Sequence, residues 1–256
     1  MKVTITDNEK VIKFAIIFSN LKAEYKETNL YFRKDGLYFQ MMDASQISLV
    51  ELNIKKDWFT DYEITIEQVF GIHIETFDKI LSCIDKNYTI ELNIDEKKDK
   101  LNIVLSNGKI IKDYDMNLLD LDSEILDIPK VEYTADIILE SAIFKDYINE
   151  LIMFGDDLIL KCNENEIILS SEGDEGKSKI IINEEYLEEY GIEEEANINL
   201  SYSIKIIKII SNFVKLNKLT NIHVSEDKPL KIEYNLDNSD ENKLSFFLAP
   251  KVADEH

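Results

Sequence analysis

The segment NEKVIKFAIIFSNLK, residues 8–22, decides the fold, because its apolar side chains recur with the period of a helix. Val11, Phe14, Ala15, Phe18 and Leu21 follow one another mostly at steps of three and four residues, which places them on one face. Three further segments, at residues 75–86, 141–154 and 201–215, show the same period. The sequence therefore predicts four amphipathic helices. Polar residues near their starts are candidate N-caps: Asn8, Thr76, Ser141 and Ser203.

Between these helices the apolar period falls to two, which is typical of β-strands. The segment NLYFRKDGLYFQMM (29–42) places a turn at residues 34–36 between two alternating runs and so predicts a hairpin. The helices begin about 65 residues apart, and a group of strands follows each one, which indicates an internal repeat. We therefore expect an α+β fold of two similar βαβββ-repeat domains.

The stretch LLDLDSEILDIPKVEY (118–133) matches neither period, is acidic and contains Pro129. These properties are typical of a connection between domains. The predicted division is an N-terminal domain at residues 1–117, a linker at 118–133 and a C-terminal domain at 134–256.

The composition limits the classes of function. The chain of 256 residues carries a net charge of −22, which repels phosphate when the molecule is taken as a whole. No run of about 18 apolar residues is present, so we expect no membrane span. The start MKVTITDNEK lacks the apolar core of a signal peptide, and Cys83 and Cys162 are too few for a disulfide framework or a four-ligand zinc site. An intracellular protein is expected.

The charge is unevenly distributed along the chain. The four helical segments together carry about +3, so the acidic residues are concentrated in the strands and loops. Lys10 and Lys13 share one helix face, and so do Lys205 and Lys208. Two interpretations stay open: each lysine is ordinary solvated helix surface, or the four helices line one surface that holds a phosphate backbone without reading sequence.

No set of residues predicts a catalytic or metal site. His73, His223 and His256 are far apart in the sequence, and the acidic pairs Asp120–Asp122 and Asp156–Asp157 suit solvated turns. A glycine-rich phosphate loop, a nucleophile elbow and a histidine–glutamate zinc motif are all missing from the sequence. We expect a protein without enzymatic activity, metal or cofactor.

The chain ends with LSFFLAPKVADEH (244–256), an apolar run just before a charged terminus. A C-terminal tail is usually polar unless other parts of the structure hold it. This run is therefore either buried in the protein's own core or available to a partner.

Three motifs carry a resemblance to a known family. MMDASQISLVELNI (41–54), KDYDMNLLDLDSEILDIP (112–129) and FFLAPK (246–251) together resemble the proliferating cell nuclear antigen family of DNA sliding clamps, in order and over essentially the whole chain. The resemblance implies the DNA clamp fold, in which three chains form a pseudo-sixfold ring with helices lining a central channel and sheets outside. It implies a DNA polymerase processivity factor that encircles double-stranded DNA without sequence specificity.

The resemblance also implies partners and site residues. DNA polymerases, ligases and nucleases would dock through a short peptide with a glutamine and aromatic anchors, and a separate ATP-dependent loader would place the homotrimer on DNA in the nucleus or in a viral replication compartment. The implied DNA-facing residues are Lys10, Lys13, Lys79, Lys145, Lys205 and Lys208. The implied partner pocket consists of Met42, Ile47, Leu49, Leu126, Ile128, Pro229, Phe247, Leu248, Ala249 and Pro250. The implied subunit interface includes Tyr114, Lys177 and Ile180.

The sequence departs from the family pattern at several positions. Asp146, Asn149 and Met153 stand on the third helix where the family tends to have basic residues, so DNA contact is expected to shift toward the first and fourth helices. Glu164 replaces the lysine that accepts ubiquitin in many eukaryotic members, and Phe247 replaces a usual tyrosine. Two alternatives to a homotrimer remain: a subunit of a heterotrimeric checkpoint-type clamp, and a monomeric viral processivity factor.

Overall fold

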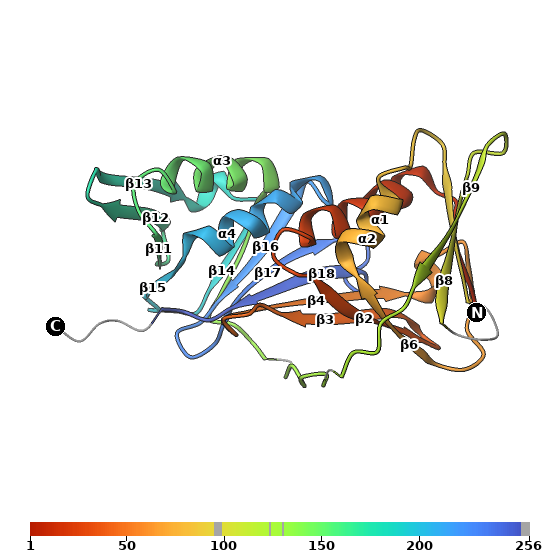
Figure 1. Cartoon of the computed structure of the whole chain (residues 1–256). Coiled ribbons are helices and arrows are strands. Elements are labelled where there is room, and N and C mark those ends of the chain that lie inside the picture. The colour runs from red at the N-terminus through yellow and green to blue at the C-terminus, as the bar shows by residue number, and fades with distance from the viewer. Residues whose placement is uncertain (95–98, 123, 130, 252–256) are drawn as a thin grey trace. The chain divides into compact units, whose positions relative to one another are not determined.

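The computed structural model describes residues 1–94, 99–122, 124–129 and 131–251 (Figure 1). The chain forms two compact units. Each unit is assembled from three separate stretches of the chain. Unit 1 comprises Met1–Asp43, Glu51–Asp127 and Asn235–Leu244, and unit 2 comprises Ala44–Val50, Ile128–Tyr234 and Ser245–His256.

Unit 1 is built from two helices and two antiparallel sheets. The first sheet has the strand order β5-β1-β7-β8-β9, and the second contains β4-β3-β2-β6. In chain order the elements are β1 (Lys2–Ile5), α1 (Asn8–Leu21), β2 (Glu27–Arg33), β3 (Gly36–Met42), β4 (Ser48–Lys55), the 3-10 helix η1 (Lys56–Trp58), β5 (Asp61–Glu63), β6 (Gln68–His73), α2 (Ile74–Leu81), β7 (Thr89–Ile94), β8 (Lys100–Ser106) and β9 (Ile111–Asn117).

Unit 2 repeats this architecture. One sheet contains the strands β14-β10-β16-β17-β18 in this order, and the other has the order β13-β12-β11-β15. Its elements are β10 (Ala135–Glu140), α3 (Ser141–Leu151), β11 (Asp157–Cys162), β12 (Glu166–Gly173), β13 (Gly176–Asn183), η2 (Glu184–Tyr186), β14 (Glu189–Ile192), β15 (Ile198–Ser203), α4 (Ile204–Ser211), η3 (Asn212–Lys215), β16 (Leu219–Val224), β17 (Leu230–Asn235) and β18 (Lys243–Leu248).

The element order and the strand order correspond one to one between the units. β1 corresponds to β10, β5 to β14 and β9 to β18, and both sheets keep their sequence of neighbours. The predicted α+β fold with two βαβββ-repeat domains is therefore confirmed.

Helices α1 and α2 pack against each other and bury the predicted apolar stripe. Val11, Phe14, Phe18 and Leu21 are buried as predicted, and the ring of Phe18 lies edge-on to that of Phe77 at 4.7 Å. Ala15 is only half-buried, and Ile17 takes the buried position instead. The buried stripe is therefore shifted around the helix, from Ala15 toward Ile17.

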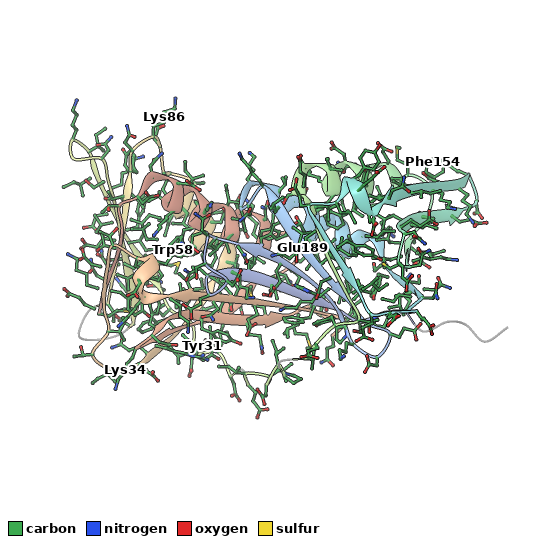
Figure 2. The ribbon with its side chains drawn as sticks, turned by 180° about the vertical axis from the view of Figure 1, so that it is seen from behind. Tyr31, Lys34, Trp58, Lys86, Phe154 and Glu189 are labelled. Atoms are coloured by element: carbon green, nitrogen blue, oxygen red, sulfur yellow. The ribbon has the colours of Figure 1, made fainter. Side chains whose placement is uncertain are left out.

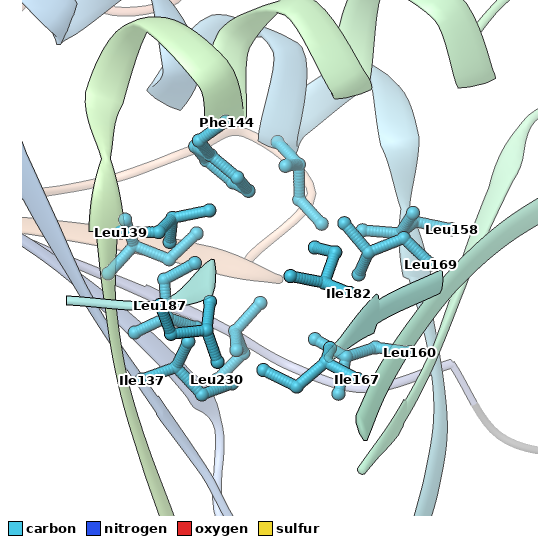
Figure 3. A pocket seen from close by; sticks show the side chains of 13 residues that line it. Ile137, Leu139, Phe144, Leu158, Leu160, Ile167, Leu169, Ile182, Leu187 and Leu230 are labelled. Atoms are coloured by element: carbon cyan, nitrogen blue, oxygen red, sulfur yellow. The ribbon is translucent and has the colours of Figure 1, made fainter. Parts of the chain in front are cut away.

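The core of unit 2 lies between its helices and its two sheets (Figure 3). A cavity of about 20 Å³ there is lined by 13 apolar side chains, among them Phe144, Leu160 and Ile182. Its volume is close to that of a single water site, and its lining offers no polar group. The cavity is therefore a packing feature of the core and not a candidate ligand site.

Three of the four predicted N-caps are wrong by position. The cap of α1 is Asp7, whose carboxylate accepts a hydrogen bond from the Lys10 backbone N–H at 2.9 Å, and α2 and α3 are preceded by His73 and Glu140. Ser203 does precede α4, but its side chain makes no capping bond. In α2, α3 and α4 a strand runs directly into the helix, so the residue before the helix is the last residue of that strand.

A backbone carbonyl from elsewhere in the unit satisfies the first N–H of each of those helices. Ile74 N–H donates to Lys26 O at 2.8 Å, Ser141 N–H to Lys218 O at 2.8 Å, and Ile204 N–H to Asp156 O at 3.1 Å. A side-chain cap is unnecessary when a neighbouring carbonyl already accepts the orphan proton.

The predicted hairpin forms, with β2 ending at Arg33 and β3 beginning at Gly36. Lys34 lies at its tip (Figure 2). Gly36 has a φ of 154°, and a Cβ atom at this position would lie 2.0 Å from Ile54 O. Glycine is required here by the close approach of another strand.

Candidate functional site

The two lysines of α1 are drawn back onto unit 1. Lys10 Nζ donates to Trp58 O at 2.7 Å and stands over the Trp58 ring, which Figure 2 labels. Lys13 Nζ donates to Leu236 O at 2.8 Å and pairs with Glu9 at 2.7 Å, and its side chain is only 13% exposed. Both cations therefore already have partners inside the unit.

Lys79 on α2 is different, because its side chain is well exposed. It pairs with Glu75 one turn earlier at 2.7 Å, and this hydrogen bond lowers the pKa of the Glu75 carboxyl. An exposed pair of this kind is weak and is screened by salt. The Lys79 cation can exchange its partner at little cost in free energy.

Unit 2 carries three lysines on its neighbouring helices α3 and α4. Lys145 and Lys208 are half-buried, and partial burial, followed by the charge of Lys145, lowers the pKa of Lys208, while the charge of Asp146 opposes this. Lys205 is exposed and pairs with Asp156 at 2.8 Å, which raises the pKa of Lys205. An anion that binds near both cations would stabilise their charged forms.

The first part of the linker is held along unit 1. Leu118 N–H donates to Asp99 O at 3.0 Å, Leu119 N–H donates to Gly71 O at 2.8 Å, and Asn29 Nδ2 donates to Leu121 O at 3.1 Å. At Gly71 a Cβ atom would lie 2.4 Å from Leu119 O, so this close approach needs glycine. Between Leu118 and Leu121 the linker is fixed by individual hydrogen bonds and not by a helix or a longer strand, which agrees with the missing apolar period.

The last part of the linker is held on unit 2. Lys228 Nζ donates to Glu132 O at 2.7 Å, and Thr134 N–H donates to Ser225 Oγ at 2.8 Å. The Tyr133 ring lies 5.5 Å from that of His223. Burial, with a smaller contribution from the Glu233 charge, raises the pKa of Tyr133 to about 12.

The C-terminal tail alternates between the core and the surface. Phe246 and Leu248 are buried, whereas Phe247 is half-buried and Ala249 is exposed. The predicted pocket residue Leu248 is 1% exposed, so its side chain supports the surface from beneath. Alternate residues of the tail are therefore buried in the protein's own core, and the residues between them are left at least partly exposed and available to a partner.

Backbone bonds fix the end of the tail within unit 2. Ala249 N–H donates to Ile47 O at 2.9 Å, and Lys251 N–H donates to Ser201 O at 2.7 Å. The Lys251 ammonium also pairs with Asp157. These contacts bring the implied pocket residues Ile47 and Ala249 together.

The other implied pocket residues lie at the surface of their own units. In unit 1, Met42 and Leu126 are both exposed. In unit 2, Pro229 is exposed, and Leu49, Ile128 and Pro250 are half-buried. Apolar side chains left partly in water are the usual material of a docking surface.

The implied interface residues lie on strands that end a sheet within the described part of their unit. β9 carries the half-buried Tyr114, and a hydrogen bond with the Cys83 thiol raises the pKa of its phenol. β13 carries Lys177, which pairs with Glu172 at 2.9 Å, and the half-buried Ile180. The tyrosine and the isoleucine are each partly available for contact.

Two exposed residues on these strands were missed by the sequence analysis. Ile111 on β9 is 72% exposed, and Ile181 on β13 is also well exposed. The sequence did contain a signal. In the runs KIIKDYDM and KSKIII, consecutive isoleucines interrupt the alternation, so an apolar residue falls on each face of the strand. Apolar residues on both faces of a strand indicate contacts beyond its own core.

His223 and the acidic pair Asp156–Asp157 have structural partners. His223 Nδ1 lies 2.5 Å from Asp136, Asp156 pairs with Lys205, and Asp157 pairs with Lys251. Within the described ranges, no three His, Cys, Asp or Glu side chains gather as metal ligands. His256 lies outside those ranges. Among the helices that are described, none is long and apolar enough to cross a membrane.

Comparison with known proteins agrees with this architecture. Residues 7–125 match the family model of the proliferating cell nuclear antigen N-terminal domain, and residues 127–251 match that of its C-terminal domain. The chain is also 30% identical over 248 residues to a probable DNA polymerase sliding clamp 2 of Paramecium bursaria Chlorella virus 1. That alignment covers 96% of this chain and 89% of the relative. The chain therefore belongs to the proliferating cell nuclear antigen family of DNA sliding clamps.

Proposed function

We propose that the protein is a DNA sliding clamp that acts as the processivity factor of a DNA polymerase. The observation that carries this function is the pair of units with the same element and strand order, together matched by both family models. Each unit supplies two neighbouring helices, as a repeated lining of a channel requires. The similarity to a probable viral polymerase clamp supports the same role.

The clamp is proposed to encircle duplex DNA as a homotrimer. β9 presents Asp113 and Asp115, whereas β13 presents Lys177 and Lys179, so the two strands carry opposite charge. Each also exposes an isoleucine, and each ends a sheet in the described part of its unit. Pairing of β9 of one copy with β13 of the next would cover both edges and close a ring.

The DNA-facing surface is proposed to lie on the four helices, with unequal contributions. Lys79 and Lys205 are exposed, and Lys145 and Lys208 are half-buried. The ammonium groups of Lys10 and Lys13 instead donate hydrogen bonds to backbone carbonyls of unit 1. We therefore assign the larger share of phosphate contact to α3 and α4, and a lesser share to α1 than the sequence suggested. Enclosure of the duplex allows each of these contacts to stay weak.

Partner enzymes are proposed to dock on apolar residues of each unit, which are Met42 and Leu126 in unit 1 and Ile47, Phe247 and Ala249 in unit 2. Partly exposed apolar side chains around well-held backbone suit a peptide with aromatic anchors. The ring would require a separate ATP-dependent loader, and the clamp itself would perform no chemistry and need no cofactor. Replication DNA, in a nucleus or a viral replication compartment, is its proposed site of action.

The test of the proposed function is primer extension by the polymerase of the same organism on a long single-primed template. Adding the wild-type clamp and a loader is expected to lengthen the products of a single binding event. Leu126→Ala with Ile128→Ala is expected to abolish this gain while the oligomer persists. Products of unchanged length with the wild-type clamp would refute the function.

The oligomeric state separates the homotrimer from the two alternatives. A closed trimer of the 29.8 kDa chain has a mass of about 89 kDa, measurable by light scattering across a dilution series. A mass near that of one chain would support a monomeric factor or a ring that needs paralogous subunits.

A further inference from the structure

Gln40 binds the linker at one of the proposed pocket residues. Its Nε2 donates to Leu126 O at 3.0 Å, and Leu126 N–H donates to its Oε1 at 2.8 Å. The side-chain amide thereby makes the same two bonds that a residue of a neighbouring strand would make. Both residues belong to unit 1, although 86 positions separate them in the chain.

The amide is held in one orientation by its neighbours. The Tyr38 hydroxyl donates its hydrogen to Glu51 Oε1 at 2.9 Å, and accepts from Gln40 Nε2 at 3.2 Å. Burial, followed by the Glu51 charge, raises the pKa of Tyr38, so the phenol remains a donor. Since the phenol hydrogen is committed to Glu51, the amide nitrogen must face Tyr38, and the amide oxygen is left for Leu126 N–H.

The Leu126 side chain is left free by this arrangement. It is 46% exposed, and the neighbouring Ile125 is exposed as well. On β3, Met42 lies two residues after Gln40 and so points to the same face. Gln40 thus fixes the backbone of Leu126 on the face from which Met42 projects.

We propose that Gln40 is a positioning residue for partner docking, which orders Leu126 before a peptide arrives. The inference rests on the proposed function, because the peptide is the aromatic-anchored segment of a replication enzyme. A linker that is already ordered spares the peptide the loss of backbone freedom on binding, and this raises affinity without an additional contact. No direct contact between Gln40 and the peptide is required.

The experiment compares wild type with Gln40→Leu, which keeps the size of the side chain and removes both hydrogen bonds. The probe is a synthetic peptide with one glutamine and aromatic anchors, titrated by calorimetry. The dissociation constant is expected to rise about tenfold, as the loss of two ordinary hydrogen bonds allows. The Leu126 amide of the free protein is expected to exchange its hydrogen at least several-fold faster.

The matched control is Asn29→Ala, which removes another side-chain bond to the linker, at Leu121. This variant is expected to bind the peptide as wild type does, because the backbone of Leu126 stays held. Thermal unfolding of both variants separates a local effect from general loss of stability.

A third variant tests the positioning role through the pH dependence of peptide affinity, which a purely structural role of Gln40 would not change. In Gln40→Glu the introduced carboxylate can accept from Leu126 N–H but cannot donate to Leu126 O. Protonation restores that donor, and an ordinary glutamate has a pKa of about 4.3, so affinity relative to wild type at the same pH is expected to increase as the pH falls from about 6 to about 4.

The outcomes are distinguishable. If wild type fails to bind the peptide, the pocket of the proposed function is refuted, and this inference with it. If wild type binds and Gln40→Leu binds equally well, with unchanged exchange at Leu126, the inference alone is overturned.

Discussion

Close backbone approaches place the sharpest demands on single residues of this clamp. At Gly36 any side chain would strike the carbonyl of Ile54. At Gly71 it would strike the carbonyl of Leu119, where the linker begins. Both positions need glycine for the space around them, which differs from the need for glycine in a turn.

Gly36→Ala is expected to destabilise unit 1 by about 2–4 kcal/mol, because strand β4 must move to admit the methyl group. Urea unfolding followed by far-UV circular dichroism measures the change. Gly108→Ala is the matched control: Gly108 also has a positive φ, of 81°, but no atom lies within 4 Å of the place that a methyl group would take there. The control is expected to lose only about 1 kcal/mol. Equal losses would show that φ alone, and not contact, requires glycine at Gly36.

Some residue-scale features were readable in the sequence, and others were not. The apolar run FFLAPK left two explanations open, core or partner, and the structure shows that Phe246 and Leu248 are buried, although the resemblance had placed Leu248 in the partner pocket. The hold of Gln40 on Leu126 left no sequence signal, because a bond between a side chain and a distant backbone has no period. The positions of Lys10 and Lys13 also predicted a helix face correctly without revealing that carbonyls of unit 1 already bind both cations.

At the scale of elements, periodicity located every helix to within a few residues. What it could not locate were the N-cap positions of α2 and α3, because the first N–H groups of these helices bond to carbonyls far along the chain. The hydrophobic stripe of α1 was likewise placed slightly wrongly, since the tertiary structure buries Ile17 and leaves Ala15 half-buried. Local patterns specify the element, and tertiary contacts set its limits.

The proposed DNA contact can be apportioned among the helices by mutating their lysines separately. Lys145→Glu with Lys208→Glu reverses two neighbouring charges of unit 2 and is expected to shorten primer-extension products several-fold. Lys10→Met with Lys13→Met is expected to have a smaller effect on product length and a larger one on unfolding temperature, because those cations bind carbonyls of unit 1. The reverse ranking of product lengths would contradict the assignment to α3 and α4.

The strands β9 and β13 carry the prediction on assembly. Ile111→Asp is expected to convert the trimer into smaller species in light scattering, because it places a charge on the apolar part of the proposed seam. Ile66→Asp is the control, since Ile66 is similarly exposed, at 69%, but lies on neither strand. A trimer that survives Ile111→Asp at micromolar concentration would place the subunit contact elsewhere.

At the scale of the whole molecule, the net charge of −22 opposes compaction and assembly alike. Raising the salt concentration from about 0.05 M to about 0.3 M screens this repulsion and is expected to raise the unfolding temperature by a few degrees. Differential scanning calorimetry measures the shift. Sucrose at matched osmolality is the control for general solvent effects. A decrease with salt would mean that attractive ion pairs outweigh the repulsion.

The tethered lysines of α1 bear on how such a ring would move. A cation that is free to reach outward forms a directed bond with each passing phosphate and must break it before the duplex can advance. Cations bound to their own backbone, as Lys10 and Lys13 are, contribute a smooth positive field instead. A smooth field would let the DNA slide past with less friction. The clamp would then stay on the DNA because the ring is closed and not because of individual bonds to phosphates.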